Sequence, residues 1–303
     1  MKDIIRITLG LTITCIIAGI ILGAIYSGTE KAKQKNARQR EQAAMSALLG
    51  YNAKNKAPAD LIFHPVYRYI IAGKDEQYIG YLLPVIKQGG DGYDLLLLKL
   101  DGVFADYHQL SIHPDDAEDE FRRNSAIQSQ MPDYLCSFAD SFFVATKGKS
   151  RTAYLLSGAF PGFKTFIKVM IASSLSHELV GFEILESEED PGLGGEIAEV
   201  YFKNQFKDKS LERIRSLKVI KDPLPEEYRT YLEESKKQRT LLSNEELDNI
   251  RNMYRDKDIY AITGATISSQ AVTNGVVSIL LKFAHRIEKL DEAVRQQKIA
   301  VSF

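Results

Sequence analysis

The sequence predicts an α+β protein in which an N-terminal transmembrane helix precedes a mixed α/β domain with an antiparallel sheet and flanking helices. Three observations support this prediction: a long uncharged segment close to the start, short apolar runs separated by turn residues in the middle, and apolar positions at helical spacing near the end. The 303 residues suffice for one large domain or two modest ones, and a hydrophobic content of 45% is ordinary for a protein with a proper core.

The first predicted element is a membrane-spanning helix over residues 7–26. These twenty residues carry no charge and are rich in Ile and Leu. At a rise of about 1.5 Å per residue, they match the roughly 30 Å hydrocarbon core of a bilayer. The side chains of Thr8, Thr12 and Thr14 can hydrogen-bond back to the helix. A cleaved signal peptide is the alternative, but its apolar region usually spans roughly 7–15 residues. No A-x-A site follows here, so we favour an uncleaved anchor.

Two further features of this segment leave alternatives open. Gly19 and Gly23 form a small-xxx-small pair that would let a partner helix approach closely, although glycine is common in membrane helices generally. The segment after the anchor carries more Lys and Arg than the short N-terminal flank, which weakly favours a cytoplasmic location for the rest of the chain. Residues 30–49 are rich in Ala, Lys, Gln and Arg and precede Gly50, so we expect the helix to continue through them.

The middle of the chain alternates between short apolar runs and turn residues, a pattern typical of strands. The predicted strands are Tyr67–Ala72, Tyr78–Ile86, Tyr93–Leu100, Ser141–Thr146, Ala153–Ser157, Phe166–Ile171 and Leu179–Leu185. Residues 104–135 are more polar, and they include a charged stretch from Asp116 to Arg123 that predicts a helix.

The last third of the chain is predicted to be mainly helical. A glycine-rich turn over residues 191–195 precedes a predicted helix from Glu196 to Phe206, and residues 222–256 are highly charged and helical in pattern. Ser243 and Glu246 have the spacing of a capping box. A short apolar strand, Ile259–Ile262, then leads through a loop into a predicted amphipathic helix. Its apolar positions recur at three- and four-residue spacing, at Ala271, Val272, Val276, Ile279, Leu280, Phe283 and Ala284.

Composition excludes several functional classes. A formal net charge of −1, with Lys and Arg spread along the chain, provides no field for nucleic acid, so we expect no nucleic-acid partner. The two cysteines, Cys15 and Cys136, form no CxxC motif, which excludes thiolate iron–sulfur sites, c-type haem and most structural zinc sites. The five histidines are scattered without ligand spacing, so we expect no metal site.

The segment Thr263-Gly264-Ala265-Thr266 joins the last predicted strand to the start of the last predicted helix. Its small residues leave room for a bulky group, and Gly264 permits a positive φ. The first turn of a helix offers unpaired N–H groups and a partial positive charge, which suit a phosphate. Thr266 places a hydroxyl there. The alternative is that these Thr and Ser residues are ordinary helix caps.

This segment resembles the S/T-G-A-T flavinylation motif of the FMN-binding domain family. That family includes the G subunit of the Rnf electron-transport complex and the C subunit of the sodium-translocating NADH:quinone reductase. In the family, a flavin transferase links the phosphate of FMN to the last threonine of the motif through a phosphoester bond. The resemblance therefore implies covalent FMN on Thr266, with Thr263, Gly264, Ala265 and Ser268 beside it. The continuation over residues 267–276 resembles the Rnf version more than the other.

A second segment, residues 189–197, is similar to the family's E-T-P-G-L-G loop, which borders the flavin. The resemblance assigns Glu189, Pro191, Gly192, Leu193 and Gly194 to the FMN site. Further matches occur at Gly162, at residues 180–185, and at residues 206–209, which resemble F-x-G-K. The similarity covers roughly residues 1–50 and 150–285. Two positions depart from the family pattern: Tyr260 stands where the family has an aspartate six residues before the acceptor, with Asp258 the nearest acid, and Asp190 replaces a threonine.

The resemblance implies an electron-relay subunit of a membrane ion-translocating oxidoreductase, of the Rnf or the sodium-translocating quinone reductase type. Its partners would be other membrane subunits of the complex, the flavin transferase during maturation, and membrane lipid around residues 7–26. The flavin domain would lie outside the cytoplasm, against the charge count. A stand-alone flavin carrier and a non-flavinylated membrane scaffold are the alternatives. The expected parts are 1–28 (anchor), 29–58 (juxtamembrane helix), 59–150 (expanded N-terminal part of the extracytoplasmic domain), 151–221 (first part of the FMN-binding domain), 222–256 (charged helical insertion) and 257–303 (flavinylation motif and C-terminal helix).

Overall fold

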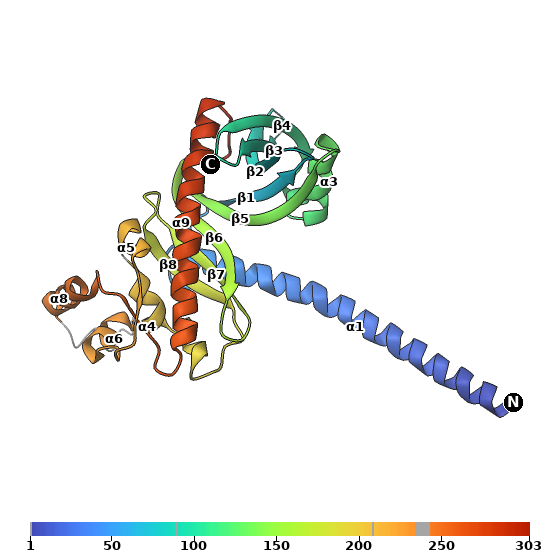
Figure 1. Cartoon of the computed structure of the whole chain (residues 1–303), viewed down its shortest axis with the longest axis horizontal. Helices are drawn as coiled ribbons and strands as arrows, with labels where there is room; N and C mark the ends of the chain where they lie inside the picture. The colour runs from blue at the N-terminus through green and yellow to red at the C-terminus, as the bar shows by residue number, and fades with distance from the viewer. Residues whose placement is uncertain (1, 89, 208, 234–242) are drawn as a thin grey trace. The chain divides into compact units, whose positions relative to one another are not determined.

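A computed structural model describes residues 2–88, 90–207, 209–233 and 243–303, and these residues divide into two compact units, Met1–Ala44 and Met45–Phe303. The first unit is formed by helix α1, which runs from Lys2 to Leu48 and continues into the second unit (Figure 1). Within the described residues, one helical segment, Ile4–Tyr26, is long and apolar enough to cross a membrane; its mean hydropathy is 2.3 and none of it is buried.

Two expectations from sequence are confirmed for α1. The hydroxyls of Thr8, Thr12 and Thr14 donate to the carbonyl oxygens four residues earlier, at 2.7–2.9 Å, so these polar groups are satisfied within the helix. The helix continues through residues 30–48 and ends at Leu48, just before Gly50, whose φ of +84° is the left-handed conformation that glycine adopts after helix ends.

The second unit is built on one eight-stranded antiparallel sheet. Its strands are β1 (Leu61–Ala72), β2 (Gln77–Lys87), β3 (Gly90–Lys99), β4 (Phe104–Ile112), β5 (Leu135–Lys147), β6 (Ser150–Pro161), β7 (Phe166–Ser173) and β8 (Leu179–Glu186), in the spatial order β4-β3-β2-β1-β5-β6-β7-β8. The seven strands predicted from sequence for the middle of the chain are all present. The eighth, β4, falls in the segment predicted to be polar. It is an edge strand whose one partner among the described residues is β3, and it is partly exposed, so its sequence lacks a strong apolar pattern.

Helices cover both faces of the sheet. Leu95 and Leu97 of β3 face one hydrophobic cluster, while Leu96 and Leu98 face the other, because successive side chains of a strand point to opposite faces. Helices α2 (Pro114–Ala117) and α3 (Glu120–Gln130) cover the first cluster. The long helix α9 (Thr266–Gln296) covers the second; Figure 1 shows it running across the sheet.

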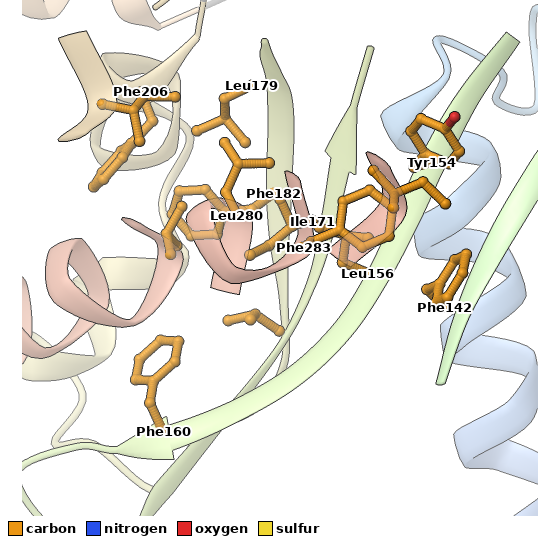
Figure 2. Packing of buried hydrophobic residues seen from close by; sticks show 14 of the residues in the cluster. Phe142, Tyr154, Leu156, Phe160, Ile171, Leu179, Phe182, Phe206, Leu280 and Phe283 are labelled. Atoms are coloured by element: carbon orange, nitrogen blue, oxygen red, sulfur yellow. The ribbon is translucent and has the colours of Figure 1, made fainter. Parts of the chain in front are cut away.

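The amphipathic pattern predicted for the C-terminal helix is confirmed in α9. The buried apolar side chains include Val272, Val276, Leu280, Phe283, Ile287 and Leu290. In Figure 2, Phe283 lies beside Phe142 and Tyr154, with ring centroids 5.1 Å from each. Burying an aromatic or aliphatic side chain of this size contributes roughly 1.5–3 kcal/mol. This row of contacts therefore attaches the helix firmly to the sheet.

Two helix predictions need correction. The predicted helix Glu196–Phe206 is instead three short pieces, η1 (Gly194–Ala198), α4 (Val200–Lys203) and η2 (Asn204–Phe206). It breaks at Glu199, whose backbone is extended, and the buried rings of Phe202 and Phe206 after the break lie 5.7 Å apart. The predicted helix Asp116–Arg123 is split between α2 and α3, because Asp119 caps the second helix instead of continuing the first.

The remaining elements are short and lie before α9. Helices α5 (Leu211–Arg215), α6 (Glu226–Leu232) and α8 (Asn244–Tyr254) accompany a two-stranded parallel sheet of β9 (Val219–Ile220) and β10 (Ile259–Tyr260). The capping box at Ser243 and Glu246 is confirmed, with both reciprocal hydrogen bonds present. The prediction of helix over 222–256 holds for α6 and α8, while residues 234–242 lie outside the described residues.

Candidate functional site

The site begins where the chain turns from β10 into α9. The N–H of Ala265 donates to the carbonyl oxygen of Ile262 at 2.9 Å, and Gly264 between them has a φ of +79° that favours glycine. Ala265 is the N-cap residue and Thr266 the first residue of the helix. Across the described part of the chain, no side chain caps this helix. The sequence alternative, in which Thr or Ser caps α9, is therefore wrong, and the first N–H groups remain available to a ligand.

The buried hydroxyl of Ser269 holds this turn closed. It accepts a hydrogen bond from the N–H of Ile262 and donates one to the carbonyl oxygen of Ala265, both at 3.0 Å. Residues on either side of the motif are thereby tied together, and the half-buried side chain of Thr266 is set at the helix start. Sequence reasoning did not single out Ser269 as a site residue. Its position within the first helical turn was the available signal.

The carboxylate of Glu189 brings three segments together at this point. One oxygen accepts from the hydroxyl of Ser268 at 2.5 Å, and the other accepts from the backbone N–H groups of Phe163 and Lys164 at 2.7 and 3.2 Å. Glu189 is only 7% exposed, so its charge depends on these three donors. The β6–β7 turn, the glycine-rich loop and the start of α9 form one junction, although Glu189 and Ser268 are 79 residues apart.

Glycine is required where the loops approach one another. A Cβ on Gly194 would lie 2.5 Å from Glu189 Oε2 and 2.7 Å from Ser268 Oγ, so no larger residue fits without movement. A Cβ on Gly264 would lie 3.1 Å from a methyl carbon of Leu193, which places the two predicted loops side by side. Gly192 has a φ of +74° and open space around it.

The structure therefore brings together most of the residues selected from sequence. Glu189, Gly194 and Ser268 meet directly, and Leu193 lies beside Gly264. The remaining predicted residues are close to these because they adjoin them in the chain. Ala265 is buried, whereas Thr263 and the loop residue Pro191 are exposed.

Exposed apolar side chains surround this polar junction. Phe163 is 59% exposed, Leu193 47% and Ile267 62%, and each adjoins a residue of the junction. Large apolar groups at the surface beside a specific polar site commonly mark a binding surface. The arrangement suits a ligand with an anionic end and a flat apolar body. The common location of Phe163, Leu193 and Ile267 was not evident from sequence, because these residues come from three separate segments.

A second layer of contacts supports the strand that leads into the motif. The buried amide of Gln205 accepts from the N–H of Tyr260 at 2.8 Å and donates to its carbonyl oxygen at 3.2 Å, as a neighbouring strand would. The ammonium group of Lys209 donates to the carbonyl oxygens of Arg255 and Lys257 at 2.6 and 2.9 Å. Burial lowers the pKa of Lys209 to about 8. Sequence patterns identified Lys209 but not Gln205.

The departures from the family pattern have a structural explanation. The ring of Tyr260 packs at 6.2 and 6.4 Å from the rings of Tyr228 and Tyr254. The side chain of Asp258 accepts from Arg213 at 2.6 Å and from the N–H of Lys218 at 3.0 Å. Burial opposes ionisation of Asp258, but the hydrogen bond and charge of Arg213 outweigh it and lower the pKa. Asp258 is thus already engaged in holding α5 to β10.

The uncapped helix start, the hydroxyl at its first residue and the adjoining glycine loop form an arrangement that suits a phosphate group. The sequence pattern of the FMN-binding domain family matches residues 162–280. The chain is 30% identical over 159 residues to the G subunit of the proton-translocating ferredoxin:NAD(+) oxidoreductase complex of Clostridium ljungdahlii, an alignment that covers 50% of this chain and 68% of that protein. The chain belongs to the FMN-binding domain family.

A solved structure was also similar, that of the C subunit of the Na(+)-translocating NADH-quinone reductase from Parabacteroides distasonis. It shares 19% identity with a TM-score of 0.32, over 52% of this chain and 65% of that chain. The chain thus spans about two thirds of the length of each of these relatives.

Proposed function

We propose that this chain is an electron-relay subunit of a membrane ion-translocating oxidoreductase complex, of the Rnf or the sodium-translocating quinone reductase type. In this proposal FMN is bound covalently, through a phosphoester bond to Thr266. Membership of the FMN-binding domain family supports the cofactor, and the similarity to the G subunit of a proton-translocating ferredoxin:NAD(+) oxidoreductase supports the role within a complex. Other subunits of that complex are the expected partners.

The observation that carries the proposal is the position of Thr266. Its hydroxyl stands at the first residue of a 31-residue helix whose N-terminus has no side-chain cap in the described chain. The aligned peptide dipoles place a partial positive charge there, which stabilises a phosphate. Glu189, the carboxylate bonded to Ser268 in the first turn of the helix, is satisfied by three hydrogen-bond donors, so its charge is compensated within the protein. The residues present therefore fit a phosphate ester.

The remaining parts of the site fit the rest of the cofactor. Gly192 and Gly264 keep the surface beside the helix start free of bulk, and the exposed side chains of Phe163, Leu193 and Ile267 offer apolar surface. FMN supplies the electron-transfer chemistry when bound. The protein's contribution is to hold the phosphate through Thr266 and the N–H groups of α9, and to cover one side of the ring with apolar groups.

Attachment requires only the hydroxyl of Thr266 and an external transferase. The Thr266 oxygen forms a bond to phosphorus, the hydroxyl proton is released, and the bond from phosphorus to the leaving group of the flavin donor breaks. The mass of the chain then increases by one FMN less one water. Glu189 is committed to the hydrogen bonds described above, so it is not available as a base for this step.

We further propose that residues 7–26 anchor the chain in lipid and that the flavin domain lies outside the cytoplasm. The apolar helix Ile4–Tyr26 supports the anchor. The extracytoplasmic location follows the family resemblance and opposes the charge count of the flanks. Protease treatment of spheroplasts tests it: digestion of the domain from outside is the expected result, and full protection would contradict the proposal.

Covalent attachment is tested by expressing the full chain with a flavin transferase and viewing a denaturing gel under ultraviolet light. A fluorescent band is expected for the wild type and for Thr263→Ala, the matched control in the same motif, and no fluorescence for Thr266→Ala. Intact mass should show the increment of one FMN less one water in the first two proteins alone. A dark wild-type band, or a fluorescent Thr266→Ala band, would refute the attachment and favour the scaffold alternative.

A further inference from the structure

A cavity lies in the sheet domain, away from Thr266. It has a volume of about 770 Å³ and is bounded by β5, β6 and α9. None of the residues assigned above to the FMN site lines it. The first residue of α9 that does so is Gly275, nine residues after Thr266, and at about 1.5 Å per residue this is roughly 13 Å along the helix.

The cavity exists because two neighbouring strands separate. β5 and β6 are paired only over residues 142–147 and 150–156. Beyond this stretch, residues 135–141 of β5 pair with β1 and residues 157–161 of β6 pair with β7, so the two strands leave an opening between them. Helix α9 crosses this opening and closes one side of it, with residues from Gly275 to Leu290 in the wall.

The apolar part of the wall is rich in aromatic rings. Phe142, Phe160 and Phe283 contribute their rings, and Figure 2 shows them among the buried residues of the domain. The ring of Phe138 lies on the other face of the sheet, against Tyr69. Small residues, including Ser157 and Ala159, line part of the wall beside these rings. A cavity of this volume with aromatic walls and a few polar groups is typical of a small-molecule site.

The polar part of the wall carries an excess of positive charge. Arg68 from β1 donates to both oxygens of Asp140, the only carboxylate that lines the cavity within the described chain. Arg286 from α9 donates to one of the same oxygens at 3.0 Å. Burial opposes ionisation of Asp140, but the hydrogen bonds and charges of the two arginines outweigh it and lower its pKa. One negative charge thus faces two positive charges.

Two more cations line the cavity. Lys168 has its own partner, Glu186, at 2.6 Å. Lys282 has no ion-pair partner within the described residues. It lies one turn before Arg286 on α9, and residues four apart lie on the same side of a helix. Lys282 and Arg286 therefore present one unpaired ammonium group and a guanidinium group with free N–H donors to the same cavity.

We propose that this cavity binds an amphipathic anion, a molecule with a carboxylate or phosphate group attached to an apolar body. The anionic group is held by Lys282 and Arg286, and the apolar body lies against the rings of Phe160 and Phe283. Hydrogen bonds between a cation and an anion are about twice as strong as neutral ones, so the cationic pair selects the anion over a neutral molecule of the same shape. The site is independent of the flavin.

A single fluorescent reporter can be placed in the cavity. The chain contains no tryptophan, so Phe283→Trp in the full chain, held in vesicles of a neutral lipid, reports only on this position in the cavity wall. Two brominated acids are added as quenchers: 6-bromo-2-naphthoate for an aromatic body, and 12-bromododecanoate for a lipid-like chain. Their primary amides serve as neutral probes of the same shape. The acid with the lower half-saturating concentration shows whether the apolar body of the ligand is aromatic or a lipid-like chain.

At least one acid is expected to quench saturably. Its half-saturating concentration should be about tenfold lower than that of its amide. In the same background, Lys282→Gln with Arg286→Gln should raise the half-saturating concentration of the acid by about tenfold and leave that of the amide unchanged. Asp140 keeps its bonds to Arg68 in this variant, which preserves the fold. Lys289→Gln, on the same helix but outside the cavity, should change neither value.

The proposal is overturned if acid and amide quench alike, if neither quenching saturates, or if the double variant behaves like Lys289→Gln. Thermal unfolding gives a readout that does not depend on the tryptophan. The preferred acid should raise the melting temperature of the unmodified chain and have no effect on the double variant.

Discussion

The carboxylate of Glu189 joins three segments of the flavin site, and its replacement measures what that junction contributes. It accepts from Ser268, Phe163 and Lys164. Hydrogen bonds to a charged group contribute about 1.5–3 kcal/mol each, against about 1 kcal/mol for neutral ones. In Glu189→Gln the amide oxygen can still accept from the two backbone N–H groups, and its NH₂ group can donate to Ser268, because a hydroxyl also accepts.

The two substitutions at this position should therefore differ in magnitude. Glu189→Gln converts three charge-assisted bonds into neutral ones but removes the cost of burying a charge, so we expect the free energy of unfolding to fall by about 1–2 kcal/mol. Glu189→Ala leaves all three donors without this acceptor. Water can reach the exposed residues Phe163 and Lys164, whereas Ser268 is only 3% exposed. We expect a loss of about 3 kcal/mol, mostly from the buried hydroxyl and the vacated space.

Urea denaturation of the full chain, followed by circular dichroism, measures these changes, and gel fluorescence measures flavin attachment in the same samples. Glu188→Ala is the matched control, because Glu188 is the exposed neighbour of Glu189. It should change the free energy of unfolding by less than about 0.5 kcal/mol. We also expect attachment to fall in the order wild type, Gln, Ala, as the start of α9 loosens. The reasoning fails if Glu189→Ala destabilises the chain no more than Glu188→Ala does.

Three further predictions concern the supports of the site. Burial lowers the pKa of Lys209 to about 8, so between pH 8 and its ordinary value near 10.5 the unfolded chain binds more protons than the folded chain. The free energy of unfolding should therefore rise with increasing pH, by about 2 kcal/mol by pH 9.5. Denaturation measured at several pH values should show this rise in the wild type, and Lys209→Met should abolish it. Gly275→Ala should destabilise the chain by about 1–3 kcal/mol, because a Cβ there would lie 2.1 Å from the ring of Phe160. Adding Phe160→Leu should restore part of that loss in thermal melts. If the two substitutions instead destabilise the chain additively, the clash is contradicted. Gln205→Leu removes both hydrogen bonds to the backbone of Tyr260, so the free energy of unfolding should fall by about 1–3 kcal/mol and flavin attachment should decrease. Unchanged attachment would show that these two bonds do not support the motif.

The features that sequence alone determined are those encoded by neighbouring residues. The capping box at Ser243 is a contact between residues three apart, and the face of α9 follows from a repeat of three and four positions. The Thr263–Thr266 motif likewise places a glycine with positive φ and a hydroxyl at a helix start, because the turn is formed by adjacent residues. Short-range hydrogen bonds and periodic burial can be recognised without knowing the fold.

The features that only the tertiary structure decided depend on partners far apart in the chain. Strand β4 forms because β3 offers it a partner, although its own sequence is polar. The break at Glu199 interrupts a segment whose own pattern predicts one helix, and the bond from Ser268 to Glu189 joins loops that no local pattern connects. The cavity beneath α9 arises where β5 and β6 stop pairing with each other, while β5 stays paired with β1 and β6 with β7.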